Sequence, residues 1–481
     1  MATAIPENRA PFTPEEIAAA TGGRVVRGGG ASVGVFTDSR SVVRGSAFVA
    51  IGGERFDGHS FLVEVAGRGA SALVVSKGGA PEGPAVVRVD DTRRALGEMA
   101  RAHRKRWSLA GGRSLVAITG SAGKTTTKAV LARVLGVAAA GAVHASAGNL
   151  NNDIGVPMTL FGLASEHRHA VVEVGTNAKG EIANLASIAL PDVAVLTLVA
   201  AAHTEGLGTV DDVAAEKGAL FAALPESGLA VANGDDSRAV GQLARSPSKN
   251  RATYGFSERC DYRIAGRTAQ GALGSRLRIE RPRGPALDVD SPLLGDAGAL
   301  AVAASLVAAD WVLGRSVSAD ELRSALAGMA SATEGRLAPI TLADGTLVID
   351  DSYNANPASM RSSIAVAAEL AADEKRRLFL VLGEMRELGA LSSSEHEALG
   401  RVLAEKDVAH LIAVGGDAAL VANEVERAGK SAAFAENAEQ ALPLVSARVR
   451  PGDVVLVKGS RSIATEKIVR ALVEERGKKL S

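Results

Sequence analysis

A glycine-rich loop between an apolar strand and a helical segment constrains this chain more than any other feature. The run Leu115-Val116-Ala117-Ile118 predicts a buried strand, and the loop Gly120-Ser121-Ala122-Gly123-Lys124-Thr125-Thr126-Thr127 follows it at the start of an Ala- and Leu-rich helix. In such a loop, backbone N–H groups and the helix N-terminus surround phosphate oxygens, the lysine reaches the outer phosphates and a hydroxyl binds Mg²⁺. The sequence therefore predicts a nucleotide site, with Lys124 on the phosphates and Thr125 on the metal.

The loop is shorter than a full Walker A motif. Ile118 occupies the position of that motif's first glycine, which argues against an ordinary P-loop ATPase or kinase. A glycine turn ahead of a helix with a solvated lysine is the plain alternative, and the flanking strand and triple threonine favour the phosphate site.

Apolar runs alternate with helical stretches over most of the chain, which at 481 residues is too long for one compact core. This alternation predicts an α/β protein with parallel sheets. We expect three domains, at residues 1–108, 109–332 and 333–481, the second being a doubly wound parallel sheet around the phosphate loop. A mixed region at 254–290 predicts additional β-structure, and a helix is expected at about 92–107. The remaining strand candidates are 48–51, 72–75, 170–174, 193–196, 347–349, 378–381, 411–414 and 454–457.

Composition excludes several classes of protein. Basic and acidic residues balance at 54 each, so the total charge gives no support for nucleic-acid binding. The single cysteine, Cys260, excludes an intrachain disulfide and a multi-cysteine metal site. No stretch of about 18 apolar residues and no signal-peptide pattern occurs, so we expect no membrane span and a cytoplasmic protein.

The phosphate loop with its triple threonine resembles the Mur ligase superfamily, whose members form amide bonds through acyl phosphates. Other segments carry the same resemblance over nearly the whole chain, in order. The segment 350–360 (Asp-Asp-Ser-Tyr-Asn-Ala-Asn-Pro-Ala-Ser-Met) looks like the branch that adds D-alanyl-D-alanine, because the sister ligases have different residues after the aspartate. The others are Thr37-Asp38-Ser39-Arg40, Gly52-Gly53-Glu54-Arg55-Phe56-Asp57-Gly58-His59, residues 149–157 and Lys458-Gly459-Ser460-Arg461-Ser462.

The resemblance implies a small α/β UDP-binding domain, a central P-loop ATPase domain and a C-terminal Rossmann-like domain. It implies an ATP-dependent ligase that joins D-alanyl-D-alanine to UDP-N-acetylmuramoyl-tripeptide in peptidoglycan precursor synthesis. The substrates are then small molecules and the protein is a monomer. Whether the third peptide residue is lysine or diaminopimelate stays open.

The resemblance also assigns roles to individual residues. Thr125, Glu173, His203 and Lys217 are expected to bind two Mg²⁺ ions, with Lys217 carbamylated, and with Lys124 they form the expected catalytic set. Asn152, Arg336 and Asp351 join the loop in binding ATP. Ser39 and Arg40 are expected to bind the UDP part, and Asn354 and Asn356 to close over the nucleotide and the dipeptide amine. Without the resemblance, a solvated strand-end Glu, a surface His and a surface Lys are the plain alternatives for three of these positions.

Two segments depart from the family pattern. Members usually carry Gly-x-His-x-x-x-Asn where this chain has Gly295 followed by Ala297 and Ala301, so how adenine is held is open. The strand before His203 usually ends Thr-Asn, but here it ends Thr197-Leu198. The alternatives are another amino-acid ligase of the superfamily (third-residue adding or folylpolyglutamate-like) and a catalytically silent nucleotide-binding protein of wall synthesis. The Tyr-Asn-Ala-Asn-Pro segment opposes the first, and retention of the phosphate and metal residues opposes the second.

Overall fold

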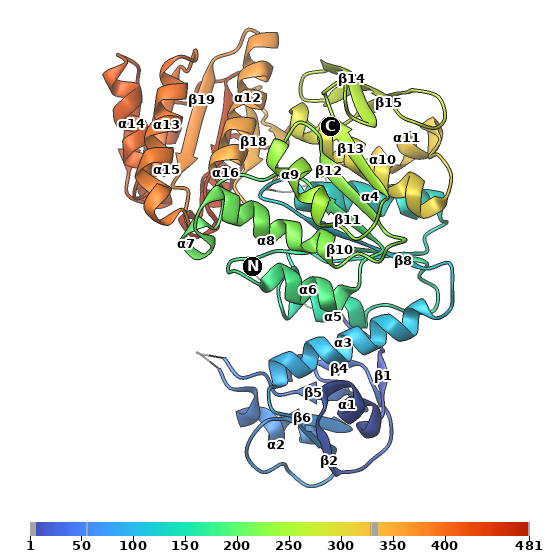
Figure 1. The fold of residues 1–481 in the computed structure, drawn as a ribbon. Coiled ribbons are helices and arrows are strands. Elements are labelled where there is room, and N and C mark those ends of the chain that lie inside the picture. The colour runs from blue at the N-terminus through green and yellow to red at the C-terminus, as the bar shows by residue number, and fades with distance from the viewer. Residues whose placement is uncertain (1–5, 54–55, 328, 330–334, 480–481) are drawn as a thin grey trace.

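Three α/β units, each built on its own sheet, make up the protein (Figure 1). The structure, a computed structural model, describes residues 6–53, 56–327, 329 and 335–479. Glu54 and Arg55 of one family-like segment lie outside this range. The described part confirms the predicted α/β class with three units.

The N-terminal unit has a five-stranded sheet in the order β2-β7-β6-β5-β4, parallel except for β2. Its strands are β2 (Arg24–Arg27), β4 (Val35–Phe36), β5 (Ala47–Val49), β6 (Ala72–Val75) and β7 (Ala85–Arg88), with a separate pair β1 (Pro11–Phe12) and β3 (Ser32–Val33). Its helices are α1 (Pro14–Thr21), α2 (Leu62–Gly67) and α3 (Thr92–Ser108).

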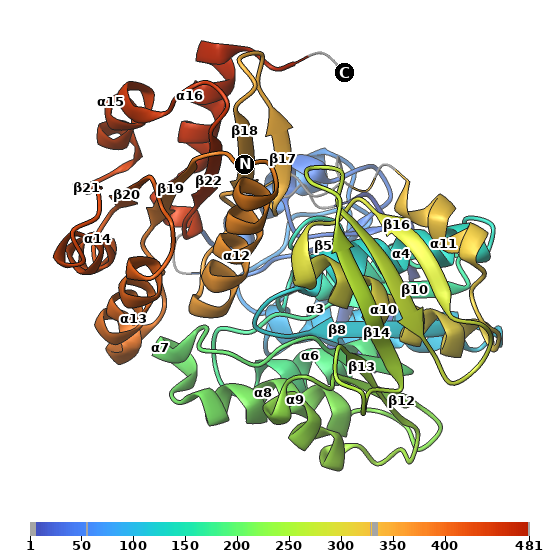
Figure 2. The ribbon, with the colours of Figure 1, turned by 90° about the horizontal axis from the view of Figure 1, so that it is seen from above.

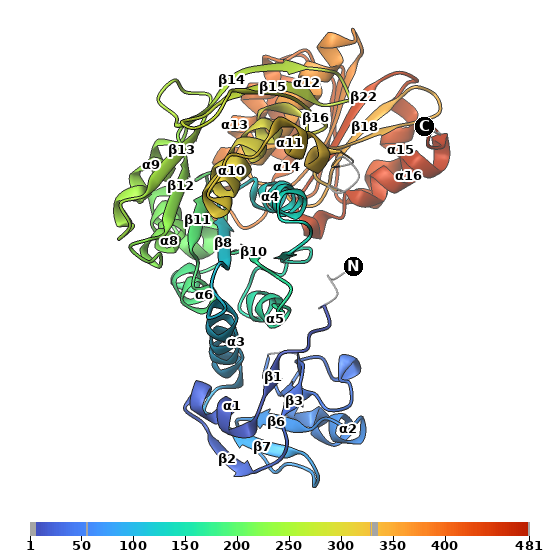
Figure 3. The ribbon, with the colours of Figure 1, turned by 90° about the vertical axis from the view of Figure 1, so that its right-hand side faces the viewer.

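Helix α3 lies between the N-terminal sheet and the middle unit (Figure 1, Figure 3). It packs against α1 on one side and against α5 (Gly155–Phe161) and α6 (Glu181–Ala189) on the other. One apolar core therefore runs continuously from Phe12 through Met99 to Leu115. The predicted boundary at 108/109 falls at the end of this shared helix and stays a prediction; the boundary at 332/333 lies outside the described residues.

The middle unit contains a nine-stranded sheet in the order β16-β15-β14-β13-β12-β11-β8-β10-β9. The pairs are parallel from β14 to β9, whereas β15 pairs antiparallel with both of its neighbours. The strands are β8 (Ser114–Thr119), β9 (Val143–Ala145), β10 (His169–Glu173), β11 (Val193–Leu196), β12 (Leu229–Asn233), β13 (Arg251–Gly255), β14 (Tyr262–Ala269), β15 (Ser275–Glu280) and β16 (Leu287–Ser291). The further helices are α4 (Lys124–Ala138), α7 (Thr204–Leu207), α8 (Val210–Ala222), α9 (Ser237–Gln242), α10 (Gly295–Leu313) and α11 (Ala319–Leu326).

Strand β8 explains why this sheet is covered on both faces. Leu115 and Ala117 enter the core formed with α5, α6 and α8, and Val116 and Ile118 enter the core formed with α4, α10 and α11. A strand buried on both faces needs a continuous apolar run, which is what the sequence supplies. Helix α10 is long and apolar enough to cross a membrane by composition, but 67% of it is buried inside the structure, as a core helix would be.

The C-terminal unit has a six-stranded sheet in the order β17-β18-β22-β19-β20-β21, parallel except for β17. The strands are β17 (Ala338–Thr341), β18 (Leu347–Asp351), β19 (Leu378–Gly383), β20 (His410–Val414), β21 (Ala432–Ala435) and β22 (Val454–Lys458). The helices are α12 (Pro357–Asp373), α13 (Ser392–Ala404), α14 (Ala418–Arg427), α15 (Ala438–Arg448) and α16 (Glu466–Arg476). Seen from above, α12 lies on the side of this sheet that faces the middle unit (Figure 2), and it contacts α10.

Candidate active site

A cavity of about 910 Å³ lies between the middle and C-terminal units. In the middle sheet β8 stands between β11 and β10, and the crevice at the carboxyl ends of parallel strands where the order reverses is the usual ligand site of such a sheet. Most of the residues predicted to bind nucleotide, metal or dipeptide line this cavity. They are Ser121, Ala122, Gly123, Lys124, Thr125, Thr126, Asn152, Glu173, His203, Arg336, Asp351, Asn354 and Asn356.

The phosphate loop is braced by the segment that follows β11. The Thr197 hydroxyl donates to Ala122 O at 2.5 Å, and Ser121 N donates to Leu198 O at 2.7 Å. Gly120 has a φ of 152°, and a Cβ at this position would lie 1.9 Å from Thr197 Oγ1, so only glycine fits beneath the loop. The loop thus depends on backbone and hydroxyl contacts that leave its N–H groups near the start of α4 available to an anion.

Lys124 starts α4 and points back over the loop, where its Nζ donates to Gly120 O at 2.7 Å. Burial lowers the pKa of Lys124; the Glu173 carboxylate opposes this shift, and the Arg336 charge adds to it. Two cations therefore share one poorly hydrated cavity, which favours binding of a polyanion.

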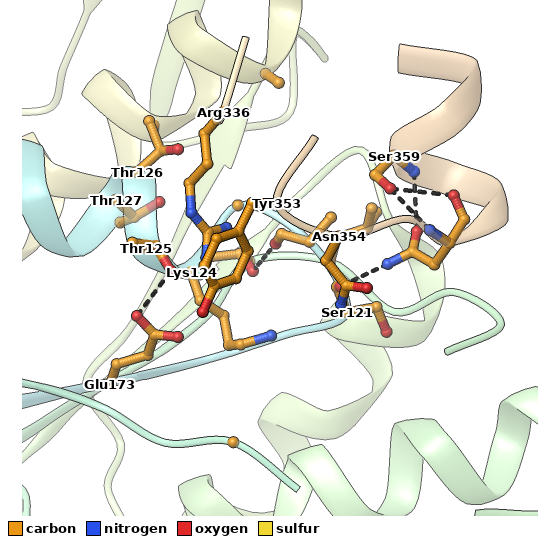
Figure 4. A pocket seen from close by; sticks show the side chains of 18 of the residues that line it. Ser121, Lys124, Thr125, Thr126, Thr127, Glu173, Arg336, Tyr353, Asn354 and Ser359 are labelled. Atoms are coloured by element: carbon orange, nitrogen blue, oxygen red, sulfur yellow. Dashed lines mark hydrogen bonds between the residues drawn. The ribbon is translucent and has the colours of Figure 1, made fainter. Parts of the chain in front are cut away.

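Glu173, at the end of β10, is a buried acid of the cavity with three side-chain partners. Its carboxylate accepts from Thr125 Oγ1 and Asn151 Nδ2, each at 2.9 Å, and Lys128 Nζ lies 3.1 Å from Oε2 (Figure 4 shows the Thr125 bond). Burial raises the pKa of Glu173, but the charges of Lys128, Lys124 and Arg336 outweigh it and hold this pKa below its usual value. Glu173 is thus an ionised carboxylate beside a hydroxyl, a donor set that fits Mg²⁺ when phosphate oxygens complete the shell. Among the described residues, no group of three His, Cys, Asp or Glu side chains forms a metal site on its own.

Sequence reasoning did not single out Lys128 and Asn151, which hold this carboxylate. Lys128 lies three positions after Thr125 on α4, so both side chains share one face of the helix. The three-residue spacing between Thr125 and Lys128 can be recognised in the sequence alone. Asn151 sits in the family-like segment 149–157, where the prediction chose its neighbour Asn152. The Asn152 side chain lines the cavity, and its Oδ1 accepts from Gly155 N at 2.8 Å, which closes the turn that starts α5; its role in binding ATP stays a prediction.

His203 lies at the cavity, whereas Lys217 is buried and does not line it. His203 lines the cavity and has a φ of 57°, and its Nδ1 lies 2.5 Å from Glu387 Oε2 of the C-terminal unit. Lys217, in α8, is 1% exposed and is not among the residues that line the cavity. Burial, aided by the charge of Lys124, holds the pKa of Lys217 well below its usual range.

The C-terminal unit contributes a second buried ion pair. Asp351 and Lys458 end the adjacent strands β18 and β22, and Lys458 Nζ donates to Asp351 Oδ2 at 2.6 Å. Lys458 also donates to Asn354 O at 2.9 Å, which holds the loop after β18 in place. The guanidinium of Arg336 lies 4.1 Å from the ring centre of Tyr353, in cation–π contact (Figure 4).

Asn356 connects the C-terminal unit directly to the phosphate loop. Its Oδ1 accepts from Ser359 N at 2.9 Å, which caps α12. Its Nδ2 donates to Ser121 O at 2.9 Å, across the two units. The predicted dipeptide-side residues and the phosphate loop therefore meet in one cavity.

The part of the cavity beside the start of α10 is mostly apolar, with the carboxylate of Asp296 as an exception. Ala297 and Ala301 line it together with Leu293, Leu294 and Leu300. The wall that carries His and Asn in the family pattern thus offers van der Waals contact without side-chain hydrogen bonds from these two positions. Asn233 and Tyr254 line the same cavity and supply polar groups from neighbouring strands.

Ser39 and Arg40 are not among the residues that line this cavity. They lie in the N-terminal unit, where Ser39 is buried and Arg40 is exposed. The Arg40 guanidinium donates to its neighbour Asp38 through Nε at 2.9 Å and Nη2 at 2.7 Å. A ligand that contacts both Arg40 and the phosphate loop must therefore be long.

Comparison with known proteins agrees with this architecture. Residues 33–104 match the model of the Mur ligase family catalytic domain, residues 118–309 the Mur ligase middle domain, and residues 335–461 the glutamate ligase domain of Mur ligases. The UDP-N-acetylmuramoyl-tripeptide–D-alanyl-D-alanine ligases of Escherichia coli and Bacillus subtilis are 37% and 32% identical to this chain. Each alignment covers 92% of this chain and 93% of the relative. A crystal structure of MurF from Acinetobacter baumannii superposes with a TM-score of 0.86 at 31% identity, covering 97% of this chain and 100% of that one. Since the similarity spans all three units in order, the chain belongs to the Mur ligase family.

Proposed function

We propose that this protein is an ATP-dependent ligase that joins D-alanyl-D-alanine to UDP-N-acetylmuramoyl-tripeptide. The observation that carries the proposal is the single cavity in which the phosphate loop meets the loop bearing Asn354 and Asn356. Full-length similarity to relatives named for this reaction supports it. A solved MurF ligase from Thermotoga maritima, in complex with ADP, is 28% identical with a TM-score of 0.77 over 92% of this chain and 97% of that one, which supports ATP as the nucleotide.

The proposed reaction has two steps. The terminal carboxylate of the tripeptide attacks the γ-phosphorus of ATP, which gives an acyl phosphate and releases ADP. The amine of D-alanyl-D-alanine then attacks the acyl carbon, so the C–O bond to phosphate breaks and an amide forms. Lys124 and Arg336 lower the repulsion between the carboxylate and the phosphates, and the cavity holds the reactants at attack distance.

The cation in this proposal is Mg²⁺, held by Thr125 and Glu173. It would screen the phosphate charge and polarise the phosphoryl group. A second ion would use His203, whose Nε2 would bind it while Nδ1 keeps the contact with Glu387 that fixes the orientation of the ring.

Carbamylation of Lys217 is part of the same proposal. A neutral amine adds to CO₂ and loses a proton to give a carbamate, so the lowered pKa of Lys217 favours the reaction. A carbamate would turn the buried amine into an anionic oxygen donor. Carbon-13 NMR of the protein under ¹³CO₂ tests this, because a carbamate signal absent from a Lys217→Met variant identifies the site.

We further propose that the protein acts as a monomer in the cytoplasm, where ATP and nucleotide-linked precursors are found. The first unit would bind the UDP part through Ser39 and Arg40, and the tripeptide would extend from there toward the cavity. A long substrate fits the separation of these two residues from the cavity lining.

Phosphate release in a complete mixture, with each component omitted in turn, tests the function. The mixture holds purified protein, ATP, Mg²⁺, D-alanyl-D-alanine and UDP-N-acetylmuramoyl-tripeptide containing either lysine or diaminopimelate. The expected result is release that needs both substrates, and a product heavier by the dipeptide. Release with a single amino acid but not with the dipeptide would instead assign another ligase of the family. Nucleotide binding without release in any mixture would assign a silent binding protein, which the apolar wall at Ala297 and Ala301 would then help to explain.

A further inference from the structure

An arginine on the antiparallel hairpin of the middle unit joins the two units that form the cavity. Arg267, on β14, donates to Glu369 Oε1 through Nη2 at 2.7 Å and to Oε2 through Nη1 at 3.1 Å, a bidentate pair. Its Nε donates to Asp296 Oδ1 at 2.6 Å. Glu369 belongs to α12, and Asp296 lies in the first turn of α10. One guanidinium therefore connects a cavity-lining helix of each unit.

This pair is more enclosed than an ordinary surface ion pair. The side chain of Arg267 is 15% exposed and that of Glu369 is 31% exposed. Close packing surrounds it: Ala272 at the hairpin tip packs on the apolar core of the C-terminal unit, and a Cβ on Gly295 would lie 2.3 Å from Val366 Cγ2 of α12. The hairpin and the start of α10 thus hold α12 from one side (Figure 3).

The other end of α12 touches the phosphate loop. Asn356, its N-cap, donates to Ser121 O at 2.9 Å. Glu369 lies about 20 Å further along the helix at the usual rise per residue. Helix α12 is therefore tied to the middle unit near both ends, and a change at the Arg267 end alters how its N-terminus approaches the loop.

We propose that Arg267 is a positioning residue for the ligase reaction: by holding Glu369 it fixes the angle of α12, and so sets Asn354 and Asn356 against the phosphate loop. Arg267 is not among the residues that line the cavity and acts through the helix. The role in catalysis rests on the proposed function. The orientation of α12 does not, and it can be measured separately.

The same hairpin offers a matched control. Arg276 on β15 makes two bonds to Asp290, at 2.8 and 2.9 Å, but both partners belong to the middle unit and both are exposed. We would compare Arg276→Gln with Arg267→Gln, Glu369→Gln and the double variant. Turnover, the KM for ATP and the melting temperature are measured for each.

Interdomain distance provides the readout that does not depend on activity. In a Cys260→Ser background, Lys249→Cys in the middle unit and Glu426→Cys on α14 place spin labels at two exposed positions. Pulsed electron resonance then gives the distribution of distances between the units, without nucleotide and with ADP. A narrow distribution means that the orientation of the C-terminal unit is fixed.

We expect Arg267→Gln and Glu369→Gln each to lower kcat about tenfold with a smaller change in KM for ATP, because alignment rather than nucleotide contact is lost. The double variant should be no worse than Arg267→Gln alone, since that substitution already removes the pair with Glu369, together with the bond to Asp296. The distance distribution should broaden in these three variants and not in Arg276→Gln. An unchanged distribution in Arg267→Gln overturns the proposal, as does a broadened distribution with wild-type kcat. If the wild-type protein has no ligase activity, the proposed function fails, while the distances still decide whether Arg267 fixes α12.

Discussion

The Lys128–Glu173 pair gives the sharpest test of how the cavity is built. Replacing Lys128 by Met removes the cation 3.1 Å from the Glu173 carboxylate, and the two side chains are only 6% and 2% exposed. Removing one partner of a buried pair usually costs about 3–5 kcal/mol, because the remaining charge is poorly solvated. Glu173 keeps its bonds from Thr125 and Asn151, so we expect the lower end, about 3 kcal/mol.

Thermal unfolding of metal-free protein measures this loss. For a unit of this size, about 3 kcal/mol corresponds to a fall in melting temperature of roughly 6–12 °C. The double variant Lys128→Met/Glu173→Gln should recover part of it, since neither member of the pair is then left charged without its partner. The same substitution at exposed Lys249 is the control and should leave the melting temperature unchanged.

The pH dependence has a definite sign. The pKa of Glu173 is lowered in the folded protein, so its contribution to stability is present at neutral pH and lost as pH falls through that pKa. Without Lys128 less of the effect of burial is offset, so the pKa of Glu173 rises in the variant and protonation of its carboxylate costs less free energy. The difference in stability between variant and wild type should therefore shrink as the pH is lowered. A Lys128→Met protein as stable as wild type at pH 7, or a double variant no better than the single one, would refute the reasoning.

Three further changes test the loop, the buried amine and the apolar wall. Gly120→Ala should abolish detectable ATP binding by calorimetry, since its Cβ would collide with Thr197 Oγ1; near-normal affinity would contradict this account of the loop. Lys217→Met should lower turnover roughly 100-fold if a charged donor is lost. Its melting temperature at pH 7 should not fall, because the lowered pKa of Lys217 means that the buried cation is unfavourable at that pH. Ala301→Asn adds an amide to the apolar wall and should lower the KM for ATP roughly two- to tenfold. The KM for GTP, which presents different groups on its base, should change less, and equal changes would place the base elsewhere.

Local pattern was enough to predict most of the parallel strands. The runs at 72–75 and 193–196 form β6 and β11 with the predicted bounds, because strands buried on both faces are continuously apolar. The interior strands β7 and β12 were not predicted, although both are largely buried. The short edge strands β9 and β21 were not predicted either. They are only partly buried over most of their length, so their sequences lack a long apolar run.

Some residues of the candidate site could likewise be predicted from local sequence, and others could not. The phosphate loop is contiguous in sequence, so its residues could be named before the fold was known. Lys128 and Asn151 contact the carboxylate of Glu173, which lies on β10, and nothing in the sequence around either residue indicates this partner. Only the resemblance connected Glu173 and His203 to the loop, and the structure brings both to the cavity. The structure also shows the contact between His203 and Glu387, which joins the middle and C-terminal units.

Contacts between the middle and C-terminal units were the hardest to foresee, and they bear most directly on the chemistry. The Arg267–Glu369 pair joins residues about a hundred positions apart. Both lie outside the family-like segments, Glu369 further along α12 than segment 350–360, and each residue alone reads as a solvated charge. The pair at Asn356 and Ser121 involves two motif residues, yet their meeting depends on the angle between two sheets. That angle depends on side-chain contacts at the boundary between the units, which cost less free energy to rearrange than the large apolar core that fixes each sheet. A reaction that must admit three substrates and then exclude water needs this kind of adjustable boundary. We therefore expect the residues that set the angle between these two units at the contacts between them, outside the motifs that identify the family.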